Sequence, residues 1–175
     1  NFRKKKPTHN QNIEIRNIEL DSPKNIYITA NSIKLDSSLK WNQKFNDDEI
    51  TLSLHRWNWL LRSITDEKKP GSHQWGINII RSYLKSMSAF PNGIASESYT
   101  VGERISNLYL FNFYHKGQLP RDLVNSIADM SYKLINNIEY YETYSTGNHV
   151  INNARAIIFA GYLLKEKNYL QLGAS

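Results

Sequence analysis

The apolar residues of this chain change their spacing near residue 47, and that change limits the possible folds more than any other feature. From there to residue 64 they recur every three or four positions, as on one face of a helix. These residues are Ile50, Leu54, Trp57, Leu61 and Ile64. The same spacing predicts further helices. They begin near Ser72, Thr100, Pro120, Asn148 and Asn168. Short links favour antiparallel neighbours, so residues 46–175 are predicted to form an all-α body of helical hairpins.

Helix-start signals support this prediction. Asp47 or Asp48 is placed to cap the first helix, and Pro120 suits the first position of the fourth. Thr100, followed three residues later by Glu103, fits a capping box, in which each side chain accepts a hydrogen bond from a backbone N–H. The third helix is therefore predicted to open at Thr100.

Within residues 1–45 apolar and polar residues nearly alternate, which is the pattern of a half-buried strand. A turn-forming segment at 21–25 divides this pattern in two. The apolar residues are Ile13, Ile15, Ile18, Leu20, Ile26, Ile28, Ile33 and Leu35. We therefore predict a lead-in arm of short strands or extended chain, packed on the helical body.

Composition excludes several classes of protein. The 175 residues include no cysteine, which excludes disulfides, thiolate metal sites and a cysteine nucleophile. No apolar run approaches the roughly 20 residues that span a bilayer. The chain begins with Asn1 rather than Met, and we expect it to be a piece of a larger protein.

The net charge of +6 is partly local, because Arg3, Lys4, Lys5 and Lys6 stand together. Such a run is either a solvated lead-in or a contact for an anionic polymer. Elsewhere the basic residues are scattered rather than gathered on one helix. This distribution counts against a nucleic-acid-binding domain, and no nucleic-acid partner is predicted.

The helix predicted from Asn148 to Leu164 carries the best candidate site. Its predicted buried face consists of Val150, Ile151, Ala154, Ile157, Ile158 and Gly161. Asn148, Asn152 and Arg155 form a polar stripe on the other side, with His149 beside it. The first turn of a helix presents unpaired N–H groups and a positive dipole end, which suit a carboxylate. The alternative is that Asn148 only caps the helix and His149 only fills a surface position.

Arg104 and Asn107 lie one turn apart in the third helix, with Tyr99 just upstream. An arginine can bind a carboxylate through two parallel hydrogen bonds, so these residues are candidates for substrate binding. The alternative is a solvated arginine, or one that forms a salt bridge with Glu103 or another neighbour.

The first helix gathers His55, Trp57 and Trp59 within two turns. An exposed indole is a good platform for the apolar face of a sugar ring, so His55 and Trp59 are further candidates. A tryptophan at helical spacing is more often part of the core, and that alternative applies to Trp57 above all.

Several familiar sites are absent from the sequence. It contains no phosphate-binding glycine loop, no HExxH or paired-histidine metal spacing and no GxSxG nucleophile elbow. No metal and no cofactor are therefore predicted. The remaining signal favours polar, metal-free chemistry or simple binding.

Three segments follow one another along the chain. Residues 54–60 read Leu-His-Arg-Trp-Asn-Trp-Leu, residues 99–107 read Tyr-Thr-Val-Gly-Glu-Arg-Ile-Ser-Asn, and residues 147–161 begin Gly-Asn-His and end Phe-Ala-Gly. In order and approximate spacing they resemble the Leu-His-aromatic segment, the Tyr-x-x-x-x-Arg-x-x-Asn segment and the Asn-His helix of heparinase II/III-type polysaccharide lyases. The resemblance runs from about residue 41 to the C-terminus.

This resemblance implies an α/α toroid of helical hairpins, followed in the parent chain by a β-sandwich domain. It also implies cleavage of an acidic, uronate-containing polysaccharide by β-elimination, in a bacterial protein that is periplasmic or secreted. In such lyases a toroid residue neutralises the uronate carboxylate, and a Tyr and a His move the protons. Asn148 matches the neutralising residue and His149 its neighbour, and Arg104 is expected to line the same cleft.

Two departures from the family pattern qualify this expectation. Asn152 stands where some members carry a Glu. The catalytic Tyr and His are expected in later segments, because Tyr140, Tyr141 and Tyr144 precede the Asn-His motif. We therefore expect the chain alone to be inactive and to form only part of a toroid. The alternative function is a non-catalytic helical module for glycan binding or for assembly of surface polysaccharide.

Overall fold

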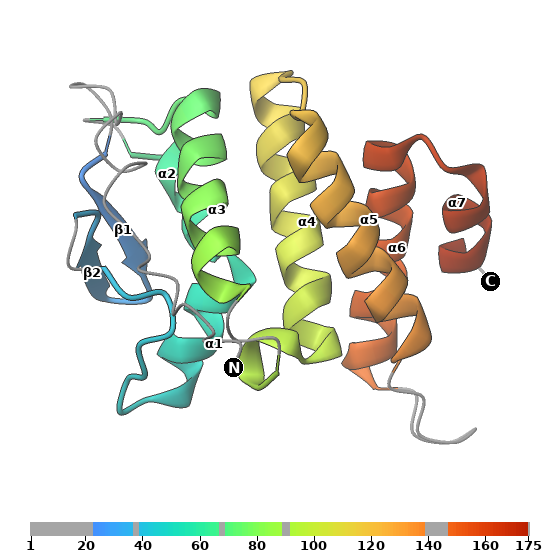
Figure 1. The fold of residues 1–175 in the computed structure, drawn as a ribbon, viewed down its shortest axis with the longest axis horizontal. Coiled ribbons are helices and arrows are strands. Elements are labelled where there is room, and N and C mark those ends of the chain that lie inside the picture. The colour runs from blue at the N-terminus through green and yellow to red at the C-terminus, as the bar shows by residue number, and fades with distance from the viewer. Residues whose placement is uncertain (1–22, 37–38, 67–68, 89–91, 139–146, 175) are drawn as a thin grey trace, which may run out of the picture.

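The computed structural model describes residues 23–36, 39–66, 69–88, 92–138 and 147–174. These residues form seven α-helices, one short 3-10 turn and a two-stranded hairpin (Figure 1). The elements are β1 Asn25–Ile28, β2 Asn31–Lys34, α1 Asp48–Arg56, α2 Asn58–Ile64, α3 His73–Met87, the turn η2 Ile94–Ser96, α4 Ser98–His115, α5 Arg121–Asn136, α6 Asn148–Leu164 and α7 Lys167–Ala174. The predicted charge run at 3–6 and the apolar residues before Pro23 lie outside the described residues.

The helices pair as antiparallel hairpins, as predicted. The start of α4 meets the end of α5, where the Ser98 hydroxyl donates to the Asn137 carbonyl over 2.5 Å. The start of α3 likewise meets the end of α4, where His73 and Asn112 are hydrogen-bonded at 3.0 Å. Helix α7 folds back on α6, so that Leu170 lies close to Gly161.

Successive hairpins stand side by side, so that their first helices run parallel. Near the starts of α4 and α6 the rings of Tyr99 and His149 are 4.7 Å apart, and further along Tyr109 and Phe159 stack at 4.2 Å. Helix α4 also contacts α1 and α2, while α5 contacts both α4 and α6. Figure 1 shows the order α3, α4, α5, α6 and α7 across the longest axis. All of α1, α4 and α6 therefore begin at the same end of the body.

The lead-in arm forms a β-hairpin that packs on this body. Strands β1 and β2 pair antiparallel, with Ile26 opposite Ile33. Ile26, Ile28 and Ile33 are buried in the same core as the helices. The indole of Trp75 in α3 donates to the Pro23 carbonyl over 3.1 Å, which fixes the arm on the body. The prediction of short strands is confirmed for residues 25–34.

The predicted first helix is not continuous. It breaks at Trp57, which adopts a left-handed conformation with φ of 62° and separates α1 from α2. The Trp57 side chain is fully buried, so tertiary packing holds a backbone conformation that a large residue rarely adopts. The apolar period continues through the break, so apolar spacing alone does not reveal it.

The buried face of α6 differs from the prediction. Asn152 and Asn153 are buried there with Ala156 and Ala160, whereas Ile151 is 67% exposed. The cause lies on α4, where a Cβ added to Gly102 would come within 2.8 Å of the Asn152 amide nitrogen. Because Gly102 has no side chain, the amides of Asn152 and Asn153 pack against α4 at this point. Of the residues predicted to be buried, Ile157 and Gly161 are buried.

Four of the six predicted helix starts are confirmed, since α6 begins at Asn148 and α7 at Lys167, and two are wrong by one or two residues. Asp47 caps α1 by accepting from the Glu49 N–H over 2.8 Å, and Ser72 caps α3 by accepting from the Trp75 N–H over 3.1 Å. Helix α4 begins at Ser98, so Thr100 lies inside it and forms no capping box. Pro120 is the residue before α5 rather than its first. Among the described residues no helix is long and apolar enough to cross a membrane.

Candidate functional site

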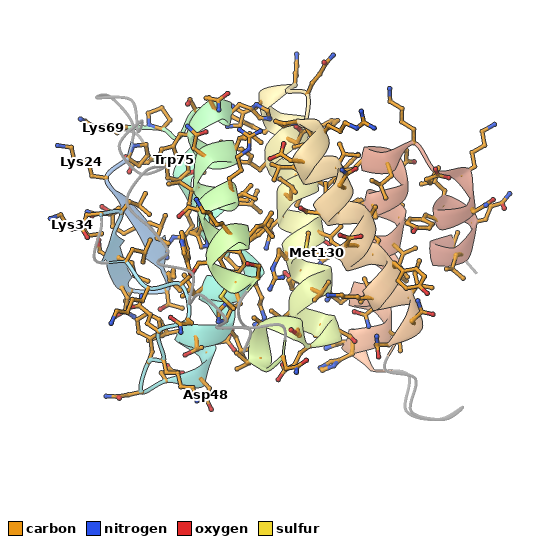
Figure 2. All side chains as sticks on the ribbon, viewed as in Figure 1. Lys24, Lys34, Asp48, Lys69, Trp75 and Met130 are labelled. Carbon is orange, nitrogen blue, oxygen red and sulfur yellow. The ribbon has the colours of Figure 1, made fainter. Side chains whose placement is uncertain are left out.

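Three cavities open at the end of the body where α1, α4 and α6 begin. The first, of about 470 Å³, lies beside α1 and has His55 in its wall. The second, of about 680 Å³, lies between the start of α4 and the end of α5. The third, of about 190 Å³, lies between the starts of α4 and α6. Figure 2 shows Asp48, the first residue of α1, at this end of the molecule. We call these the α1 cavity, the α4–α5 cavity and the α4–α6 hollow.

The α4–α6 hollow brings together four of the predicted site residues. Its lining consists of Tyr99, Glu103, Asn148, Ile151, Asn152 and Arg155. The Asn152 amide donates to the Tyr99 carbonyl over 3.0 Å and accepts from Arg155 over 2.5 Å. Arg155 also forms an ion pair with Glu103. Asn148 is exposed at the mouth of the hollow.

Aromatic and cationic side chains surround this hollow. The ring of His149 lies 4.7 Å from that of Tyr99, which makes it an immediate neighbour of the hollow. On the other side of Tyr99, the Arg56 guanidinium stands 5.0 Å from the ring centroid, at the distance of a cation–π interaction. Tyr99 therefore links the Asn-His helix to the end of α1.

Helix α6 presents its first turn to the hollow without a side-chain cap. Gly147 precedes the helix and supplies no capping group, and the first turn contains no acidic residue. The positive end of the helix dipole at this turn therefore favours an anion. With Asn148 and Arg155 nearby, this arrangement is suited to a carboxylate with neighbouring hydroxyl groups.

Arg104 does not line the same cavity as Asn148, contrary to the prediction. It is 6% exposed and lines the α4–α5 cavity. Its Nε donates to the His55 carbonyl over 2.8 Å and its Nη2 to the Ala95 carbonyl over 2.7 Å. Asn107, also buried, donates to the Arg56 carbonyl over 2.8 Å. Both residues therefore bind the chain around the break at Trp57.

His55 forms part of a buried polar cluster rather than an open binding surface. Its Nδ1 shares a hydrogen bond of 2.8 Å with the hydroxyl of Tyr83, whose ring lies 5.2 Å from the Arg104 guanidinium. Burial, followed by the positive charge of Arg104, lowers the pKa of His55 to about 4. Burial also raises the pKa of Tyr83, and Arg104 opposes that rise. His55 is thus neutral at physiological pH.

Trp59 is also buried, so the prediction of an exposed sugar platform is wrong for this residue. It is 1% exposed, and its indole donates to the Leu54 carbonyl over 3.2 Å. Its ring packs against Trp41 and Trp75 in the core. Trp57 is in the core, in agreement with the alternative given above.

Three residues of this end escaped the sequence analysis. Tyr83 belongs to no motif in the sequence, although its hydroxyl bonds His55 and its ring lies beside Arg104. Glu103 was treated as a capping residue, although it pairs with Arg155. Arg56 was noted without a role, although it lies over Tyr99. Only the adjacency of Arg56 to His55 gave a sign in the sequence.

The described residues contain no group of three or more His, Cys, Asp or Glu side chains arranged to hold a metal ion. Comparison of the chain with protein-family models, with curated proteins and with solved structures found no match. The geometry of this end of the molecule therefore carries the functional argument.

Proposed function

We propose that the α4–α6 hollow binds one acidic unit of a uronate-containing polysaccharide, in the helical part of a polysaccharide lyase-like protein. In the parent protein the bound unit is cleaved by β-elimination, and Asn148 neutralises its carboxylate. The helical hairpins are proposed to form part of an α/α toroid.

The observation that carries this proposal is the contact between Tyr99 and His149. These residues belong to the two most informative of the three resembling segments, and their rings are 4.7 Å apart. The segments are separated by a whole helix in the chain. A shared site requires them to meet, and they meet at the starts of two parallel helices.

The chemistry of the hollow also supports an acidic sugar as the ligand. A β-elimination becomes easier when the charge of the uronate carboxylate is neutralised, because the neighbouring C–H then becomes more acidic. The amide of Asn148, the positive end of the α6 dipole and the guanidinium of Arg155 are all suited to that task. Tyr99 offers a ring for the apolar face of the sugar.

The size of the hollow favours a second candidate function. Its volume of about 190 Å³ is below the 300–1,000 Å³ typical of small-molecule sites, so it holds one carboxyl group and part of a ring. A non-catalytic glycan-binding module needs no more than this.

Cleavage by the full-length parent tests both candidates. We would incubate it with polygalacturonate, alginate and hyaluronan, and follow the ultraviolet absorbance of the unsaturated product. The Asn148→Ala variant is expected to lose about 10²- to 10³-fold in rate, as when one preorganised donor is removed. Asn125→Ala is the matched control, because Asn125 is exposed on α5.

Binding by the 175-residue chain separates the two candidates. Arg155→Ala is expected to weaken binding of polygalacturonate, whereas Arg121→Ala removes an equal charge from the exposed start of α5 and serves as the control. Equal losses of affinity in the two variants would show that the polysaccharide is attracted by the overall positive charge and not bound in the hollow. Binding without cleavage by the parent would favour the non-catalytic module.

A further inference from the structure

We propose that the α4–α5 cavity is a second binding site, in which the guanidinium of Arg104 receives the carboxylate of a small sugar acid. This site is separate from the α4–α6 hollow, since the two share no lining residue. The proposal therefore goes beyond the polysaccharide function and does not depend on it.

The shape and lining of the α4–α5 cavity suit a single sugar ring. Its volume of about 680 Å³ lies within the range usual for small-molecule sites. Val101, Met130 and Leu134 make an apolar wall, while Asn92, Ser96 and Asn137 supply groups that pair with hydroxyls. A ring with one apolar face and several hydroxyls matches such a mixture.

One arm of the Arg104 guanidinium contacts only a weak acceptor from the wall of this cavity. Nε and Nη2 donate to the carbonyls of His55 and Ala95, at 2.8 and 2.7 Å. Nη1 instead faces the Met130 sulfur at 3.8 Å. The guanidinium also hydrogen-bonds the Tyr83 side chain. A thioether is a weak acceptor, so its contact satisfies Nη1 less well than a carboxylate oxygen would. Figure 2 shows Met130 partway along α5.

The charge of Arg104 is not balanced within the part of the chain that the structure describes. No carboxylate there forms an ion pair with it. The rings of Trp57 and Tyr83 stand 5.4 and 5.2 Å from the guanidinium and stabilise the cation in part. Arginine keeps its charge even when buried, and a buried cation gains most from an anion that reaches it.

The rim of the cavity carries one residue of each charge. Lys133 lines it from α5 and adds a second positive group for an acidic ligand. Glu97 lines it just before α4 and is exposed, so its carboxylate can remain in solvent. The buried part of the site, at Arg104, is therefore positive, which selects a ligand whose carboxylate enters first.

Titration of the chain with D-glucuronate, followed by calorimetry, tests this site, and D-glucose is the neutral control. Met130→Glu places a carboxylate carbon where the sulfur now lies, so that the protein supplies its own anion to Nη1. We expect this variant to bind glucuronate at least about tenfold more weakly than the wild type. Met130→Leu keeps the apolar wall and is expected to bind as the wild type does.

The outcomes distinguish this proposal from the function of the α4–α6 hollow. Binding that survives Arg155→Ala and is lost in Met130→Glu supports the proposal. Binding that survives Met130→Glu, or equal binding of glucose, overturns it. If Met130→Glu fails to fold, Lys133→Ala replaces it, because Lys133 is exposed, and an unchanged affinity in that variant also overturns the proposal.

Discussion

Two arginines on neighbouring parallel helices, at the same end of the molecule, have different structural roles. Arg104 on α4 is 6% exposed and donates to two backbone carbonyls of other elements. The side chain of Arg155 on α6 is 45% exposed and pairs with the Glu103 carboxylate. Sequence spacing assigned both to substrate binding, yet only Arg155 lies beside Asn148.

This difference shows that polar residues in a resembling segment can serve two purposes. Arg104, Asn107 and His55 hold the break between α1 and α2 against α4. Asn148 and Arg155 face a hollow that is open to solvent. The first group positions the walls of the α4–α6 hollow, and the second is placed to touch a ligand in that hollow. Mutations can separate these two effects.

Replacement of the two arginines by methionine is expected to give the largest contrast. Arg104→Met leaves two buried carbonyls without donors, so it should lower the free energy of unfolding by about 3 kcal/mol or more. Arg155→Met removes one surface ion pair and should change it by less than about 1 kcal/mol. Urea unfolding of both variants checks this. Equal losses of unfolding free energy in the two variants would contradict the assignment of Arg104 to the buried structure and of Arg155 to the surface.

The pH dependence of stability should depend on His55 to a lesser but measurable extent. Its pKa is about 4 in the folded chain and 6.5 ordinarily, so the unfolded chain binds the proton more tightly. The stabilisation is complete above pH 6.5 and is lost progressively as the pH falls towards 4.

Comparison with His55→Gln isolates this contribution. Between about pH 7 and pH 4.5 the wild type should lose on the order of 2 kcal/mol more than the variant does. Urea midpoints at the two pH values provide the measurement. If the wild type and the variant lose the same free energy of unfolding between the two pH values, protonation of His55 does not contribute to the pH dependence of stability.

The smallest expected effect distinguishes two adjacent asparagines of α6. Asn153 is fully buried, and neither of its amide atoms has a hydrogen-bond partner among the described residues. Asn153→Leu should therefore raise the free energy of unfolding by about 1 kcal/mol. Asn152→Leu should lower it by a similar amount, because Asn152 bonds the Tyr99 carbonyl and Arg155. Thermal unfolding measures both changes. A change of stability in the same direction for the two variants would contradict this assignment.

The sequence predicted the helices better than it predicted their faces. Periodicity located each helical segment, because apolar spacing follows directly from helix geometry, but it joined α1 and α2 into one helix. It failed on α6, where Ile151 was expected inside and Asn152 outside. The face that packs depends on Gly102 of another helix, and no property of the α6 sequence contains that information.

The structure brings some of the predicted site residues together and separates others, for a related reason. Asn148, Asn152, Arg155 and Tyr99 gather because their segments begin parallel helices at one end. Three other candidates were expected at a surface and are buried: His55, Trp59 and Arg104. The chain changes direction at Trp57, and α1 and α2 pack against α4 there. Spacing predicts which residues share a helix face, but only packing determines whether that face meets water.

The break at Trp57 has a consequence for how α4 finds its place along α1 and α2. It presents two consecutive carbonyls, those of His55 and Arg56, to Arg104 and Asn107, which are spaced by one helical turn. Apolar packing alone tolerates a slip of one turn between helices. Here such a slip would leave a guanidinium, an amide and both carbonyls buried without partners, so the polar pair specifies a single register for the interface.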